Sequence, residues 1–194
     1  MSNTGLQLLP LGTAGFSILR RRNQIYVDKT AQIYELASKP GKLFLVRPRR
    51  FGKSLLVSTL ESLFKYGLRD FKGLAIETLW NEKTAYNVVR LDFSEIKNFE
   101  SLDEFTLSLT SLLVRRFSPL GFVYRESNLF SVTDQLSDWL LTQPQGSLVL
   151  LIDEYDAPLT ACLNDTDVFN TVRKKLSNFY GTIKSKDDAL RFFS

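Results

Sequence analysis

Short segments rich in apolar residues alternate along this chain with segments whose apolar residues recur at helical spacing. KLFLV (42–46), NVVRLDF (87–93) and SLVLLI (147–152) have the length and character of buried strands, and LRFFS (190–194) begins a fourth. Parallel strands with helices on both faces produce this alternation, because the side chains are buried on either side of the sheet. The sequence therefore predicts an α/β fold in three layers, with a parallel sheet between two layers of helices.

Helices are predicted between these strands from capping residues and from apolar stripes. Asp28 is expected to cap a short helix through KTAQIYELA, after an irregular N-terminal segment. Ser101 and Glu104 have the spacing of a capping box at the start of another helix. A helix that follows Gly-Lys-Ser should stop at Gly67. Two more are expected over about 132–142 and about 166–180.

The residue types that are missing narrow the possible chemistry. The chain contains no histidine and one cysteine, Cys162. A Ser-His-Asp relay, an imidazole metal ligand, an internal disulfide and a multi-thiolate zinc site are thereby excluded. Cys162 is predicted to be an inert, partly buried thiol. Any chemistry must come from carboxylates, hydroxyls, lysines and arginines, with the metal or nucleotide that they bind.

Length and charge are those of one globular domain, 1–194, without a membrane partner. The longest apolar run, Leu148 to Ile152, is far shorter than the roughly 20 residues that a membrane span needs. The N-terminus has neither a basic leader nor an extended apolar segment, so we expect a cytoplasmic protein. The net charge of +4, concentrated in RRR (20–22) and RPRR (47–50), is compatible with a nucleotide or a nucleic acid as partner.

Residues Arg47 to Ser54 fit the phosphate-loop pattern G-x-x-x-x-G-K-[ST] except at its first position, where arginine replaces glycine. Gly52 would let the backbone approach a phosphate. Lys53 would offer an ammonium to the β and γ phosphates, and Ser54 a hydroxyl to Mg²⁺. The start of the following helix favours an anion as well. Because Arg47 before Pro48 forces an extended exit from the strand, a solvated basic turn stays open as an alternative.

An acidic pair, Asp153-Glu154, follows the strand SLVLLI about 100 residues later. In a nucleoside-triphosphate hydrolase, an aspartate at this place orients Mg²⁺ or its waters, and a glutamate polarises the attacking water. Ligands of open parallel sheets bind at these strand ends. The two acids can also be read as caps of the next helix, but the order of strand, loop, helix and acidic strand favours a nucleotide site.

Several longer motifs together resemble the AAA-ATPase-like domain family, P-loop proteins that often carry a C-terminal nuclease domain of the PD-(D/E)XK type. The likeness runs in register from about Leu9 to Ser194. In that family the loop reads R-P-R-R-F-G-K, so Arg47 looks like a family feature. The motifs are LPLGTAGFSILRRRNQIYVDKT, FLVRPRRFGKSLLVSTLESLF, FKGLAI, VVRLDFS and LLIDEYDAPL.

The resemblance implies an Mg²⁺-dependent ATP-binding module of ATPase type, with 1–41 as an N-terminal extension and 42–194 as the nucleotide-binding core. Ser54 and Asp153 would hold Mg²⁺, and Glu154 and Lys53 would act in catalysis. Asp28 and Lys29 are expected to be structural, and Tyr155, Asp156 and Pro158 to shape the turn after the acidic pair. The residues expected to bind nucleotide are Arg49, Arg50, Phe51, Gly52, Lys53, Ser54 and Leu55, with a role of Arg49 and Arg50 in bracing the loop as an equal alternative.

The chain ends on LRFFS, where the sheet of this class continues, so we expect a fold truncated at the C-terminus and impaired hydrolysis. Two other functions stay open: a basic nucleic-acid-binding module that uses RPRR without nucleotide turnover, and a kinase-like phosphotransferase. The sequence leaves undecided the choice between ATP and GTP, the cellular process and the formation of a homo-oligomer.

Overall fold

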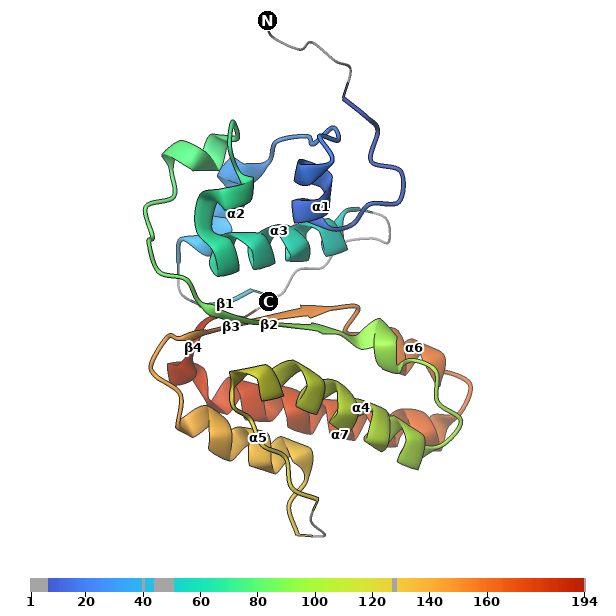
Figure 1. Ribbon diagram of the computed structural model, residues 1–194. Helices are drawn as coiled ribbons and strands as arrows, with labels where there is room; N and C mark the ends of the chain where they lie inside the picture. The colour runs from blue at the N-terminus through green and yellow to red at the C-terminus, as the bar shows by residue number, and fades with distance from the viewer. Residues whose placement is uncertain (1–6, 40, 44–50, 127–128, 194) are drawn as a thin grey trace, which may run out of the picture. The chain divides into compact units, whose positions relative to one another are not determined.

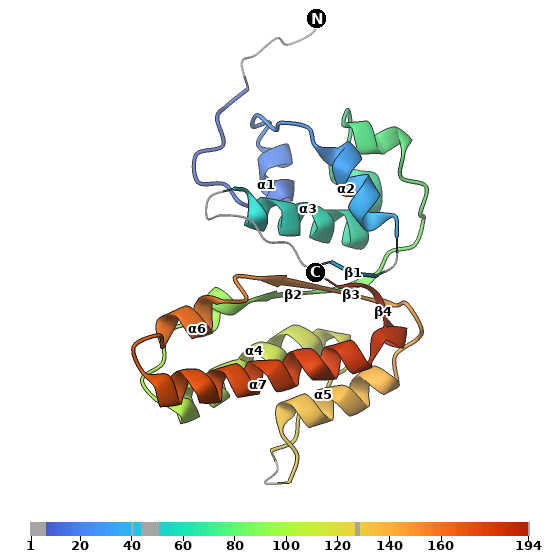
Figure 2. The ribbon, with the colours of Figure 1, turned by 180° about the vertical axis from the view of Figure 1, so that it is seen from behind.

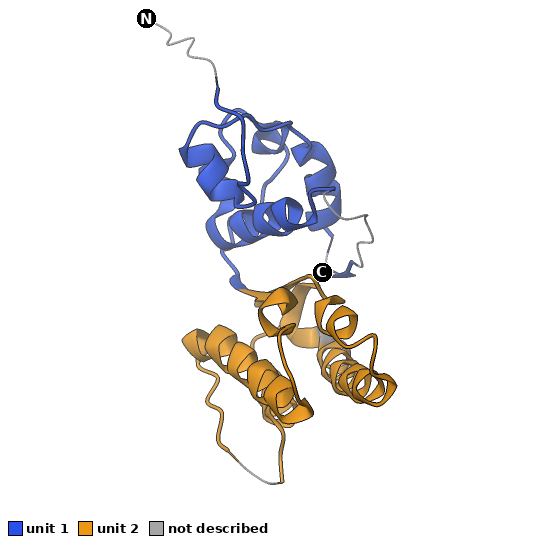
Figure 3. Cartoon of the chain, turned by 90° about the vertical axis from the view of Figure 1, so that its right-hand side faces the viewer, with its two compact units in different colours: residues 1–88 blue, residues 89–194 orange. Residues whose placement is uncertain are grey.

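The computed structural model describes residues 7–39, 41–43, 51–126 and 129–193 (Figure 1). The chain divides into two compact units, Met1–Val88 and Val89–Ser194, which Figure 3 colours separately. None of the described helices is long and apolar enough to cross a membrane.

The first unit is built around one long helix, α3. Its elements are α1 (Phe16–Arg21), α2 (Thr30–Ala37), β1 (Gly41–Lys42), α3 (Lys53–Tyr66) and the 3-10 turns η1 (Gly67–Asp70) and η2 (Ala75–Thr78). Aromatic rings fill much of its core: Phe16 packs on Phe71 with centroids 4.7 Å apart, and Phe64 on Trp80 at 5.9 Å. Helix α3 ends at Gly67, as predicted, since this residue has a φ of 59°.

Helix α1 lies in the segment that the sequence predicts to be irregular, so that expectation is wrong over residues 16–21. Six residues are too few to display a helical period. Phe16 and Leu19 are 0% and 1% exposed, and the N–H of Phe16 donates to Oγ of Ser58 on α3 (2.8 Å). Packing on α3 therefore stabilises α1, because so short a helix is not stable alone.

Asp28 of the YVDKT motif has a structural role, as expected, but it is not the N-cap residue: the helix begins at Thr30, one residue later than predicted, and Lys29 is its N-cap. Asp28 Oδ1 accepts hydrogen bonds from the N–H and the hydroxyl of Thr30 (2.8 and 2.7 Å). Its Oδ2 accepts from the N–H of Ala75 (2.8 Å). Thr30 Oγ1 also accepts from the N–H of Ile76 (3.0 Å). Asp28 and Thr30 thus join the start of α2 to η2.

Asp70, at the end of η1, accepts hydrogen bonds from three side chains. Oδ2 accepts from the hydroxyls of Ser17 on α1 (2.5 Å) and Ser62 on α3 (2.7 Å). Arg69 Nε donates to Oδ1 (3.0 Å). The bond from Arg69, with smaller contributions from the two hydroxyls, holds the pKa of Asp70 well below its usual range, because all three favour the charged carboxylate.

Replacing Asp70 with asparagine is expected to lower the free energy of unfolding of the first unit by about 1–2 kcal/mol at neutral pH, through loss of the charged acceptor of two hydroxyl hydrogen bonds. A carboxylate whose folded pKa is depressed stabilises the fold above its unfolded pKa of about 4, and that contribution is lost as the pH falls below this value. The difference between wild type and variant should therefore shrink in acid. Urea unfolding, followed by the fluorescence of Trp80 in proteins whose other tryptophan is replaced, measures this difference in unfolding free energy. An equal difference at about pH 7 and about pH 3 would contradict the role given to the charged Asp70 carboxylate.

The second unit consists of a sheet with helices packed on one side. Its strands are β2 (Asn87–Asp92), whose first two residues end the first unit, β3 (Leu148–Asp153) and β4 (Leu190–Phe193), in the order β4-β3-β2. β3 and β4 are parallel, with Leu148 opposite Leu190. Figures 1 and 2 show three helices on the same side of these strands: α4 (Leu102–Phe117), α5 (Val132–Leu141) and α7 (Thr166–Ser185). The expected α/β fold with a parallel sheet and helices, the class of the P-loop NTPases, is confirmed.

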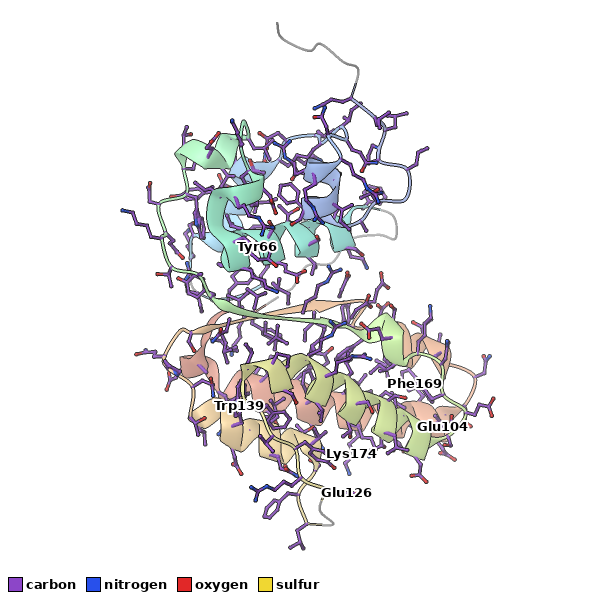
Figure 4. The ribbon with its side chains drawn as sticks, viewed as in Figure 1. Tyr66, Glu104, Glu126, Trp139, Phe169 and Lys174 are labelled. Atoms are coloured by element: carbon purple, nitrogen blue, oxygen red, sulfur yellow. The ribbon has the colours of Figure 1, made fainter. Side chains whose placement is uncertain are left out.

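The two faces of this sheet differ. One face joins α4, α5 and α7 in a single apolar core, to which Val89, Leu91, Leu148, Leu150 and Ile152 contribute. Trp139, which projects from α5 (Figure 4), packs in the same core on Phe117 at 5.7 Å between centroids. Because side chains alternate along a strand, Arg90 in β2 and Asp153 in β3 point to the opposite face.

The helix ends of the second unit agree with most of the predictions. Helix α7 continues to Ser185 instead of ending near residue 180, because Ile183 extends its buried stripe. Ser101 Oγ accepts from the N–H of Glu104 (3.2 Å), but Glu104 Oε2 accepts from the N–H of Glu100 (2.7 Å), so only half of the predicted capping box forms. A complete box lies at the start of α5, between Ser131 and Asp134, where none was predicted.

Candidate functional site

The Gly-Lys-Ser sequence forms the entry to α3. Gly52 is the N-cap residue, with φ 73° and ψ 24°, in the left-handed region. A Cβ at this position would meet no atom of the described residues within 4 Å, so the backbone conformation itself requires glycine. The first bond within the helix runs from the N–H of Leu56 to the carbonyl of Gly52 (3.0 Å). The N–H groups of Lys53, Ser54 and Leu55 therefore have no acceptor within α3 and point toward its N-terminal end.

Side chains at this helix start are accessible, while the following turn is buried. Phe51 is 65% exposed, Gly52 is exposed, and Lys53, Ser54 and Leu55 are half-buried. Residues 57–60 are buried in the first unit, where Ser58 also accepts the hydrogen bond from Phe16. The start of α3 is thus fixed by the buried turn that follows it, while its first residues are accessible to solvent. The other expected nucleotide residues, Arg49 and Arg50, lie outside the described residues, as do Arg47, Pro48 and 44–46 of the predicted first strand.

The aspartate of the acidic pair is the last residue of β3, and its side chain is 3% exposed. Asp153 Oδ2 accepts from Nη2 of Arg90 on the neighbouring strand β2 (3.1 Å). Its Oδ1 accepts from the N–H of Glu154 (3.2 Å). A buried carboxylate needs such partners, because removing it from water without them is very unfavourable.

The glutamate of the pair has a strained backbone. Glu154 has a φ of 52°, and Asn23 is the only other described non-glycine residue with a positive φ. The left-handed conformation costs about 1–2 kcal/mol for a residue with a Cβ. It lets the chain reverse directly after β3, with the N–H of Ala157 donating to the carbonyl of Glu154 (2.9 Å). Strain of this kind often occurs at functional sites, where the surrounding structure maintains it.

The residues after the acidic pair shape a turn, as expected. Asp156 is the N-cap of α6 (Ala157–Ala161), a short helix that was not predicted. Pro158 occupies the first turn of α6, where its missing N–H removes no hydrogen bond. Cys162, just beyond α6, is 7% exposed and donates its Sγ–H to the carbonyl of Pro158 (3.3 Å). Burial raises the pKa of Cys162, because it disfavours the charged thiolate, and the inertness of this thiol stays a prediction.

Arg90 also belongs to this region, although its place in the sequence does not mark it as a site residue. It is 25% exposed and lies in the middle of β2, between the buried residues Val89 and Leu91. The available signal was a charge inside a segment predicted to be a buried strand, since a charge in such a place requires a partner. The identity of the acidic partner of Arg90 depends on which strand lies beside β2, and this cannot be predicted from the spacing of residues along the chain.

The oxygen donors among the candidate residues suit Mg²⁺ better than a softer metal. Ser54 offers a hydroxyl and Asp153 a carboxylate, and Mg²⁺ prefers hard oxygen ligands. Within the described parts of the chain, no three Cys, Asp or Glu side chains gather into a ready-made metal site. A Mg²⁺ ion that takes most of its ligands from water and phosphates needs only one or two protein oxygens. A hydroxyl and a carboxylate are thus each a ligand type that suits an ion arriving with a nucleotide.

Comparison with known proteins gives a family match and one curated relative. A family model described as predicted AAA-ATPase matches residues 10–194. A protein of Azotobacter chroococcum mcd 1 named "Uncharacterized protein in vnfD 5'region" is 30% identical over 187 residues, which are 95% of this chain and 36% of that protein. The chain thus spans about a third of the length of this relative. No solved structure matches the chain.

Proposed function

The chain belongs to the predicted AAA-ATPase family, and we therefore propose that it is an Mg²⁺-dependent ATP-binding module of a P-loop ATPase. The observation that carries the proposal is the left-handed Gly52 at the entry to α3, followed at once by Lys53 and Ser54. This is the arrangement in which backbone N–H groups and a lysine together bind phosphates.

In the proposed complex, the start of α3 binds the phosphates. The N–H groups of Lys53, Ser54 and Leu55 donate hydrogen bonds to phosphate oxygens, and the positive end of the helix dipole stabilises their charge. Lys53 Nζ supplies a full positive charge toward the β and γ phosphates. Because α3 is anchored by its buried second turn, these donors are held in place before the nucleotide arrives.

The carboxylate pair would complete the site. Ser54 Oγ and Asp153 are the oxygens that would hold Mg²⁺, which when bound would neutralise negative charge on the phosphates. Glu154 would accept a proton from the attacking water as general base. The strained backbone of Glu154 supports this role, because a purely structural turn after β3 has no need of a Cβ-bearing residue in the left-handed region.

Replacing Lys53 with alanine is expected to weaken ATP binding about 10- to 100-fold, which corresponds to the loss of a hydrogen bond between charged groups. Isothermal titration calorimetry of the 194-residue chain with ATP, with and without Mg²⁺, measures the affinity. Lys65→Ala is the matched control, since Lys65 lies in the last turn of the same helix and should leave the affinity unchanged. Equal affinities for ATP in Lys53→Ala and wild type would refute the site, and parallel titrations with GTP decide between the two nucleotides.

A further inference from the structure

The carboxylate that would hold the metal already has a cationic partner. Asp153 Oδ2 lies 3.1 Å from Nη2 of the Arg90 guanidinium. The other carboxylate oxygen accepts from the N–H of Glu154. Both oxygens of Asp153 therefore face hydrogen-bond donors of the second unit. A divalent cation that approaches this carboxylate meets a positive charge within a few ångströms of its ligand.

Two cations next to one buried carboxylate repel each other strongly, because the surroundings screen charges weakly. A buried aspartate nevertheless needs a counterion whenever no metal is bound. Arg90 is this counterion, and its guanidinium can also move away from Asp153. Its side chain is long and 25% exposed, whereas that of Asp153 is 3% exposed, so the guanidinium can move toward solvent while the carboxylate stays buried.

We propose that Arg90 is the resident counterion of Asp153 in the nucleotide-free protein and that Mg²⁺ must displace it to reach this carboxylate. The inference rests on the proposed function, since it takes Asp153 as a ligand of Mg²⁺. Arg90 acts through Asp153 and is thus a positioning residue. Its presence raises the Mg²⁺ concentration that nucleotide binding requires, and it disfavours occupation of the site by Mg²⁺ alone.

The test compares wild type with Arg90→Met, which keeps the length of the side chain and removes its charge. ATP binding is measured by equilibrium dialysis over a series of Mg²⁺ concentrations. The half-saturating Mg²⁺ concentration should fall about five- to tenfold in the variant, in the range of ordinary coupling between two binding events. Arg90→Lys, which keeps a positive charge on β2, should need more Mg²⁺ than Arg90→Met. It also serves as the second variant if Arg90→Met does not fold.

Thermal unfolding adds a readout that a static ion pair would not produce. Without ligand, Arg90→Met should melt below the wild type, since Asp153 loses its counterion. Addition of Mg²⁺ and ATP should then raise the melting temperature of the variant more than that of the wild type. Arg115→Met is the matched control: it removes a more exposed arginine of the same unit that pairs with Glu95, and it should leave the Mg²⁺ requirement unchanged.

The outcomes separate this inference from the proposed function. ATP binding by wild type with an equal or higher Mg²⁺ requirement in Arg90→Met overturns the role of Arg90 and leaves the nucleotide site standing. If Arg90→Met binds ATP and the wild type does not, the role of Arg90 is supported. Failure of both folded proteins to bind ATP at any Mg²⁺ concentration overturns the proposed function and this inference with it.

Discussion

Replacing Phe179 with alanine is expected to destabilise the second unit by about 3–5 kcal/mol. Phe179 on α7 is 0% exposed, and its ring centroid lies 5.9 Å from that of Phe93 and 5.3 Å from that of Tyr180. It belongs to the single core that joins the sheet to α4, α5 and α7. Its removal would leave a cavity that the surrounding rings fill only in part, so the lost contacts add to the lost burial.

The positions of the two tryptophans allow the unfolding of the second unit to be measured separately. Trp80 lies in the first unit and Trp139 in the second. In a Trp80→Phe background, urea unfolding followed by fluorescence reports on the core around α5. Phe130→Ala is the control, because Phe130 is 56% exposed and should change the unfolding free energy of the second unit little. Similar losses for the two variants would show that Phe179 does not contribute to the core as described.

Replacing Gly52 with alanine is expected to lower the free energy of unfolding by about 1–2 kcal/mol and to weaken ATP binding about tenfold. The stability loss follows from φ 73°, which a residue with a Cβ adopts only with strain. Alanine can relieve this strain by leaving the left-handed region, but bound nucleotide would have to restore it. About 1.4 kcal/mol of restored strain corresponds to a tenfold loss in affinity.

A second glycine offers a control with the opposite sign. Gly181 lies inside α7 without a positive φ, and a Cβ there would meet no atom within 4 Å in the part of the chain that the structure describes. Gly181→Ala should therefore stabilise the protein by about 0.5–1 kcal/mol and leave ATP binding unchanged. Chemical unfolding and calorimetric titration of both variants test the pair. If Gly52→Ala has the stability and the ATP affinity of the wild type, the left-handed conformation of residue 52 is not required for the fold or for ATP binding.

Much of the fold follows from local pattern. The apolar runs at β2, β3 and β4 predict strands because a buried strand needs consecutive apolar residues. The stripes of α3, α4, α5 and α7 predict helices because each repeats over several turns. The pattern is too short at α1 and α6, which have six and five residues, so neither was predicted. For α1, contacts with distant residues supply the stability that its own sequence lacks.

Some features of the candidate site can likewise be predicted from local motifs, and others depend on the fold. Gly52, Lys53, Ser54, Asp153 and Glu154 are recognisable because each belongs to a short motif at the end of a strand or the start of a helix. Their binding roles stay proposals. The motif does not reveal how Glu154 enters the left-handed region, because that conformation belongs to a turn between β3 and α6.

The α/β class and the main helices and strands can be predicted from the amino-acid sequence, because each depends on a local pattern of residues, and the family follows from motifs spread along the chain. The pairing of Arg90 with Asp153, and the roles of Asp70 in joining α1 and α3 to η1 and of Asp28 in joining α2 to η2, follow instead from how the elements pack. These contacts link residues that are 8 to 63 positions apart in the sequence. Charged side chains have several possible partners along a sequence, and the packing of the elements selects one of them.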